Sequence, residues 1–185
     1  MPMFQAGAKN AVIGSTLVGV IVAGMIFFGG MWSEAHTQSG NDAEIARQFV
    51  GMWRLVSYTH RLADGTTRQD PKTVAYIIYT DVNRMCYVSM DPTRPKWKSE
   101  ATPTPEEAIS AIMGLGAYCA TVDVHAKEGF VIHQVEIERV PNVVGRNRKR
   151  WFKFDGANRL TLRVDTAELV SPVVERTLVW ERVQN

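Results

Sequence analysis

Histidine is the side chain most able to move protons near neutral pH, and two of the four histidines, His125 and His133, flank one predicted β-hairpin and could approach each other. Strand alternation places His133 on an apolar, inward face, together with Val131, Val135 and Ile137. His125 falls on the more polar face of its own strand. A lone inward histidine is more typical of a hydrogen-bonded core residue than of a catalyst. We therefore predict no catalytic residue and no metal site from these histidines.

Cys86 and Cys119 are the two cysteines, and they fall in separate predicted strands. Neither has a second Cys or a His at the spacing of a metal motif. They would pair if the domain faces an oxidising compartment and the two strands are adjacent. The sequence does not show that adjacency, so a Cys86–Cys119 disulfide is an open expectation.

Motifs for a nucleophile or for phosphate binding are missing from the sequence. Ser57 and Ser89 lack a nucleophile elbow, and no glycine-rich phosphate loop occurs. Lys and Arg total 21 against 19 Asp and Glu, which gives no general attraction to nucleic acid. The basic run 146–150 could touch a phosphate or anionic headgroups, but it is more typical of a solvated turn and strand start. Arg150 would be either a buried cation facing the cavity or a rim residue, and we favour the rim because an unpaired buried charge is costly. We expect no cofactor and no nucleic-acid partner.

A glycine two residues before a tryptophan opens the first predicted strand. Phe49, Gly51, Trp53 and Leu55 alternate onto one face of the segment 49–58. At the closed end of a small β-barrel, Gly51 would let the backbone approach closely and Trp53 would plug the floor. The pattern predicts a cup, and a cup predicts a ligand without naming it.

Turn signals divide the rest of the chain into short alternating runs. The eight predicted strands are 50–61, 73–80, 84–90, 117–125, 130–139, 149–154, 159–164 and 177–183. Thr104, Pro105 and Glu107 carry the N-cap, first-turn proline and capping-box glutamate of one short helix that ends at Gly114 or Gly116. Eight antiparallel strands with short connections can close into a barrel that holds side chains or one small ligand.

Large side chains on the predicted strands are the candidates for lining a cavity in this barrel. They are Tyr76, Ile78, Met85, Tyr87, Tyr118, His133 and Phe152. An ordinary filled core is the competing interpretation, because the same residues would pack well without a ligand.

The segment 11–32 contains no charged residue and is long enough to cross a bilayer. We predict a cytoplasmic N-terminus at 1–10, a transmembrane helix at 11–32, a linker at 33–44 and a barrel domain at 45–185. Lys9 precedes the helix and acidic residues follow it, so the barrel should be periplasmic or otherwise extracytoplasmic. A cleaved signal peptide, ending at the small-residue site 33–35, is the alternative.

Small residues recur every fourth position along the predicted membrane helix, at Ala11, Ser15, Gly19 and Ala23. Such a ridge lets a second helix approach closely. It favours a membrane-embedded protein partner, although glycine is also common in membrane helices without one.

The order and spacing of several motifs together resemble the bacterial lipocalin-like domain family. The resemblance covers about three quarters of the chain, and its motifs are the segments 49–58, 63–65, 79–85, 117–118, 133–136, 141–145 and 178–182. It implies a mainly β fold, an eight-stranded antiparallel lipocalin-like barrel, with a small-molecule cavity. It also implies that Arg182, on the last strand, stacks on Trp53 beside it. His133-Gln134 and Val143 depart from the family's pattern, so no shared polar site is carried over.

The sequence favours a non-catalytic function for a membrane-anchored lipocalin-like protein. It would be an accessory subunit of a membrane complex, would bind a small hydrophobic ligand such as a lipid, quinone or pigment, or would do both. A small-molecule isomerase or cyclase that works by positioning its substrate in the cavity is one alternative. A secreted carrier, released by signal cleavage, is another.

Overall fold

The structure, a computed structural model, describes residues 41–70 and 72–184. The predicted cytoplasmic N-terminus and membrane helix lie outside these residues, as do Ala11, Ser15, Gly19 and Ala23 and most of the predicted linker. Among the helices that the described residues form, none has both the length and the apolar character needed to span a membrane.

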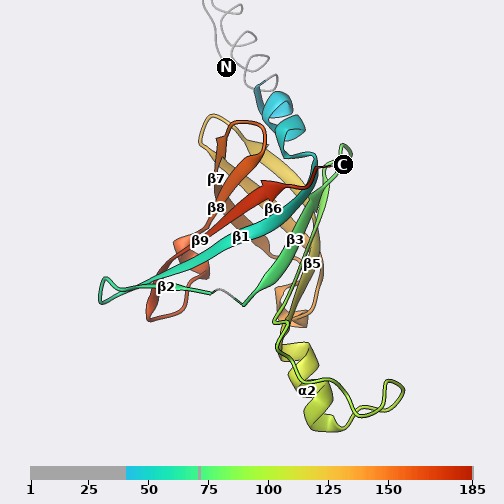
Figure 1. Cartoon of the computed structure of the whole chain (residues 1–185). Coiled ribbons are helices and arrows are strands. Elements are labelled where there is room, and N and C mark those ends of the chain that lie inside the picture. Colours follow the sequence, from blue (N-terminus) through green and yellow to red (C-terminus); the bar gives the residue numbers. More distant parts are fainter. Residues whose placement is uncertain (1–40, 71, 185) are drawn as a thin grey trace, which may run out of the picture. The chain divides into compact units, whose positions relative to one another are not determined.

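One antiparallel sheet of nine strands makes up most of the described chain (Figure 1). The strands are β1 (Gly51–Leu62), β2 (Thr67–Gln69), β3 (Val74–Tyr79), β4 (Arg84–Met90), β5 (Leu115–His125), β6 (Phe130–Glu138), β7 (Asn147–Asp155), β8 (Arg159–Val164) and β9 (Val173–Arg182). The helix α2 (Pro105–Met113) follows β4, and the short 3₁₀ helices η1 (Pro141–Val143) and η2 (Thr166–Glu168) follow β6 and β8.

The sheet closes into a barrel because β1 pairs with both β3 and β9. The closed ring has eight strands, in the order β1, β3, β4, β5, β6, β7, β8 and β9, which confirms the predicted lipocalin-like barrel. The additional strand β2 pairs with the far end of β1, outside the ring. The sequence analysis missed β2 because its three exposed residues carry no alternating apolar pattern.

The alternation of β3 has the opposite phase from the one predicted. Ala75, Ile77 and Tyr79 are buried in the barrel, whereas Ile78 is 37% exposed. Tyr76 and Ile78 share the other face, which points away from the interior. Both faces of this strand are apolar, so hydrophobicity alone does not fix which one turns inward.

Two β-bulges change the inward face partway along a strand. In β1 the register shifts between Leu55 and Ser57, so that Trp53 and Leu55 face inward before the shift and Tyr58 after it. The second register shift lies between Cys119 and Ala120 of β5. On the facing part of β6, Val135 points inward, whereas Ile137, two residues later, is 65% exposed. The prediction that Ile137 shares the face of His133 is therefore wrong.

A helical segment, residues 41–49, packs against the core just before β1. Its Phe49 is 1% exposed and contacts Tyr79, Phe152 and Phe154 edge-on or at a tilt. The Oδ1 atom of Asp42 accepts a 2.8 Å hydrogen bond from the backbone N–H of Ala126. Residues 41–44, predicted as the end of a linker, are thus helical and attached to the barrel domain.

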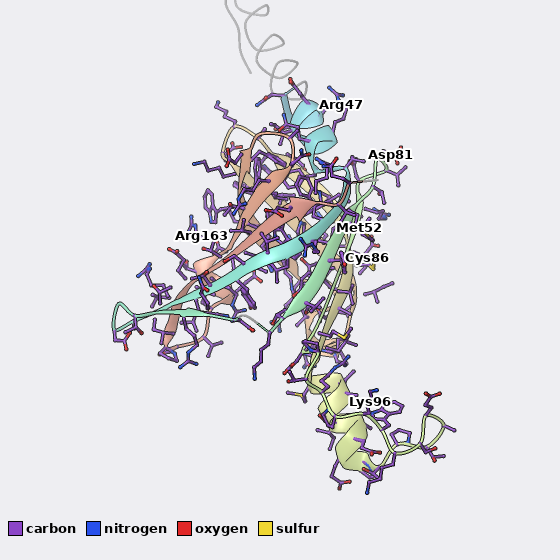
Figure 2. The ribbon with its side chains drawn as sticks, in the orientation of Figure 1. Arg47, Met52, Asp81, Cys86, Lys96 and Arg163 are labelled. Carbon is purple, nitrogen blue, oxygen red and sulfur yellow. A yellow bond between two sulfur atoms is a disulfide. The ribbon has the colours of Figure 1, made fainter. Side chains whose placement is uncertain are left out.

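The connection between β4 and β5 forms an arm that carries α2 beyond the point where β4 ends and β5 begins (Figure 1). The Thr104 side chain and Glu107 make the predicted capping box, and the helix ends at Gly114. No residue of α2 is buried. Figure 2 shows Lys96 on this arm, away from the barrel strands.

Candidate ligand-binding cavity

Arg182 fastens the closed end of the barrel. Its guanidinium carbon lies 4.0 Å from the centre of the Trp53 ring, as the sequence predicted. The same group donates to the backbone carbonyls of Val50 (2.5 Å), Gln48 (2.7 Å) and Ala157 (2.9 Å). One side chain thereby ties the helical segment, the start of β1 and the turn between β7 and β8 together.

Gly51 makes room for this arrangement. Its φ is +129°, and a Cβ atom placed there would lie 2.6 Å from Nη1 of Arg182. Only glycine adopts that backbone conformation freely, and only glycine lacks the Cβ atom that would clash with Arg182. The stacking of Arg182 on Trp53 therefore requires glycine at position 51.

A partly open cavity of about 110 Å³ lies inside the barrel. Its apolar lining is Ile77, Leu162, Val164, Leu178 and Trp180. Its polar lining is Tyr58, Tyr87, Tyr118, Arg148, Arg150 and Arg176. The interior is therefore neither a wholly filled core nor a wholly apolar one.

Three arginines contribute to the lining, and two of them have carboxylate partners. Arg150 donates to Glu168 of η2, and burial around Arg150 leaves only 10% of its side chain exposed. Arg148 lies 2.8 Å from Glu138, close enough for an ion pair but without the angle of a hydrogen bond. Arg176 has no carboxylate partner among residues 41–70 and 72–184.

His133 lies beside the cavity, fully buried between two tyrosines. The Tyr79 hydroxyl is 3.1 Å from its Nε2 and the Tyr118 hydroxyl is 2.9 Å from its Nδ1. Burial, assisted by Arg150 and Arg148, lowers the pKa of His133 well below 6.5. Burial likewise raises the pKa of Tyr79 and of Tyr118. All three groups are therefore neutral at pH 7.

Proton counting assigns the direction of these two hydrogen bonds. Tyr79, neutral His133 and Tyr118 hold three protons between them and form two bonds, so one tyrosine O–H donates elsewhere. Tyr118 lines the cavity and Tyr79 does not. Since a buried hydroxyl without an acceptor is costly, we assign the His133 proton to Nδ1, which leaves the Tyr118 O–H free for the cavity.

The structure brings together only part of the predicted cavity set. Tyr87 and Tyr118 line the cavity, Met85 and His133 are buried near it, and Phe152 packs on Phe49 nearer the closed end. Tyr76 and Ile78 belong to the outer face, as described for β3, and do not line it.

Cys86 and Cys119 are joined in a disulfide between opposed positions of β4 and β5, with their Cα atoms 4.1 Å apart. They alternate with the inward-facing Met85 and Tyr118, so the bridge lies on the outer face of the barrel. It fastens the two strands that carry the arm.

Arg148, Arg176 and Tyr58 are lining residues that sequence reasoning missed, whereas Arg150 was considered for the cavity but placed at the rim. The placement of Arg150 at the rim is wrong, because Glu168 from η2 neutralises its buried charge. Arg176 was detectable, since it alternates with Trp180 and Arg182 on β9. Tyr58 was not, because its inward direction depends on the bulge in β1.

The described residues contain no group of three or more His, Cys, Asp and Glu placed to hold one metal ion. The cavity instead presents hydroxyl and guanidinium donors above an apolar wall. Such a site can bind and orient a small molecule.

A closed eight-stranded antiparallel barrel with an internal cavity is the architecture of lipocalin-type proteins, among other small barrels. A family model described as lipocalin-like domain matches residues 50–183, and the chain therefore belongs to the lipocalin-like domain family. No curated protein matches the sequence.

Proposed function

We propose that this protein is a membrane-anchored, extracytoplasmic lipocalin-like domain that binds a small hydrophobic ligand and catalyses no reaction. The observation that carries the proposal is the cavity of about 110 Å³ with one apolar wall, formed by Leu162, Val164, Leu178 and Trp180. A dry engineered cavity of roughly 150 Å³ holds a whole benzene molecule. This cavity is smaller but partly open, so it has room for the end of a chain or for part of a ring whose remainder lies in the opening.

The chemistry of the lining supports binding over catalysis. An acid–base mechanism needs a group that gains and loses a proton near neutral pH. Arginine side chains do not exchange protons near neutral pH, and burial raises the pKa of Tyr87 and Tyr118 further from neutrality. His133 is neutral and held at both ring nitrogens.

The proposed membrane anchor rests on the uncharged segment 11–32. A free carrier has no need of a retained helix, so the anchor supports a further role as an accessory subunit of a membrane complex. The arm supports this second role, because its apolar side chains Trp97, Ile109, Ile112 and Met113 are 40–70% exposed. A membrane-embedded partner that covers the arm would bury them.

Mild detergent extraction of the full chain, followed by native mass spectrometry of proteins and lipids, tests both roles. We expect a bound small molecule that is lost in Leu178→Trp, where the new ring fills the cavity. Val179→Trp is the matched control, because it adds the same ring on the outer face of β9. Equal ligand content in both variants would place the ligand outside the cavity and overturn the proposal.

The same extraction addresses the partner and the anchor. We expect a second membrane protein to copurify, and to be lost when Ile109 and Met113 are both changed to Ser. Recovery of the chain alone would contradict the subunit role. N-terminal sequencing tests the anchor: a start at Met1 or Pro2 supports retention, and a start at His36 would show a secreted carrier instead.

A further inference from the structure

We propose that the ligand of this cavity carries an anionic group, a carboxylate or a similar small oxyanion, and that Arg176 is the residue that binds it. This inference rests on the proposed binding function and adds the chemical class of the ligand. It is carried by the charge of the lining, by donors without acceptors and by the shape of the entrance.

The charge of the lining comes first. Three arginines face the cavity and no carboxylate lines it. Glu168 pairs with Arg150 and Glu138 pairs with Arg148, although neither carboxylate lines the cavity. Two carboxylates against three arginines leave one positive charge, on Arg176. Arg176 is half-buried. A partly shielded cation gains from a counter-ion, and an anionic ligand would supply it.

Donors without acceptors make the second observation. The Nε of Arg176 and the Nε1 of Trp180 are buried and have no hydrogen-bond partner in the described part of the chain. Trp180 is only 1% exposed and, like Arg176, is a lining residue. Native proteins leave few buried N–H groups unpaired, and such groups often mark the place of a missing partner.

The remaining protons of the lining point to the same ligand class. With the His133 proton assigned to Nδ1, Tyr118 has one O–H that His133 does not use. Arginine and tryptophan N–H groups donate and cannot accept. A ligand that satisfies this set must bring acceptors, and two oxygens of a carboxylate can accept from a guanidinium in parallel.

The entrance favours an anion as well. A second, more open hollow of about 360 Å³ lies at the end of the barrel where β9 begins. Arg176 lines both hollows, and the outer one adds Arg68 and Lys72. Its carboxylate, Asp70, is outnumbered there by Arg176, Arg68 and Lys72. An anion approaching the cavity therefore passes a net positive charge.

Arg176 also affects the neighbouring titratable groups. It lowers the pKa of His60 in addition to the larger effect of burial, and it opposes the rise that burial causes in the pKa of Tyr58. Its charge is therefore felt at the cavity and at the entrance.

Benzoate and benzamide test the proposal, because they have the same shape and differ in charge. The full chain, in lipid nanodiscs, is titrated with each by calorimetry, with empty nanodiscs as the blank. We expect benzoate to bind at least tenfold more tightly than benzamide. Arg176→Gln should remove that preference and Arg176→Lys should retain part of it. Arg159→Gln, which changes an exposed arginine paired with Glu181, should leave it unchanged.

The outcomes separate this inference from the proposed function. If benzoate and benzamide bind equally well, in the wild type and in Arg176→Gln, the cavity binds ligands but the anionic class is wrong. If neither of them, nor benzyl alcohol, binds at millimolar concentration, the binding function itself is overturned.

Discussion

The guanidinium group of Arg182 lies over the ring of Trp53 and also donates hydrogen bonds to three backbone carbonyls. The first and last strands of the barrel are thus joined by one side chain, in addition to their ladder of backbone hydrogen bonds. A hydrogen bond also fixes the position of Trp53, because its Nε1 donates to the carbonyl of Phe49 over 2.7 Å.

Replacing Arg182 by alanine should lower the free energy of unfolding by about 3 kcal/mol. The change removes the cation–π contact and leaves the carbonyls of Gln48, Val50 and Ala157 without that donor. Urea unfolding followed by tryptophan fluorescence measures the loss. Arg159→Ala is the control, since an exposed ion pair contributes about 0–1 kcal/mol. Similar losses in both variants would contradict the role given to Arg182.

Replacing Gly51 by alanine should cost about 2 kcal/mol or more. The backbone there has a positive φ, and the new Cβ would also clash with Arg182. Gly65→Ala separates the two effects, because φ at Gly65 is +84° but the space around it is open. We expect that control to cost roughly 1 kcal/mol. If the two substitutions cost the same, the close approach of Arg182 has no effect on stability.

Removing the disulfide by the double substitution Cys86→Ala and Cys119→Ala should destabilise the fold by about 3–4 kcal/mol. The bridge closes a loop of 33 residues, which restricts the unfolded chain. Urea unfolding of the variant and of the oxidised wild type gives the difference. Equal unfolding midpoints, with equal slopes, would show that the bridge contributes nothing measurable.

Stability should fall as the pH drops from 6.5 towards 5, in part because of His133. Its pKa in the folded protein is well below 6.5, since burial, Arg150 and Arg148 disfavour its charge. In this range the unfolded chain binds a proton that the folded chain does not, so acid favours unfolding, by up to about 1.4 kcal/mol per pH unit.

The variant His133→Gln should flatten this pH dependence. His60, whose pKa burial also lowers, would keep its own contribution in that variant. His125→Gln is the control, because His125 pairs with Asp123 at the surface. Denaturant unfolding at pH 5.0, 5.75, 6.5 and 7.5 gives the slopes. A slope for His133→Gln as steep as that of the wild type would refute this assignment.

The barrel was predictable because its information is local. Alternation and turn residues placed the strands, the sequence Thr104-Pro105-Glu106-Glu107 placed α2, and the closure of a barrel placed Arg182 over Trp53. Each depends on neighbouring residues or on one rule of barrel topology.

The cavity was less predictable because its residues depend on distant partners. Arg150 is inside only because Glu168, eighteen residues later, neutralises it. Tyr58 turns inward only because of a bulge in β1. Ile78 was assigned to the wrong face because both faces of β3 are apolar. The alternation of apolar and polar residues along a strand predicts neither where a β-bulge lies nor which charged residues pair.

The most direct test of the central claim, that the barrel cavity binds a small molecule, is an NMR titration that follows the indole N–H signals of Trp180 and Trp53. Trp180 lines the cavity and its N–H has no acceptor in the described chain, whereas that of Trp53 is bonded to Phe49 at the closed end. Saturating benzoate should shift the Trp180 signal, because its indole N–H gains an acceptor, and leave that of Trp53 in place. No shift at Trp180, with benzoate or with benzyl alcohol, would contradict the claim.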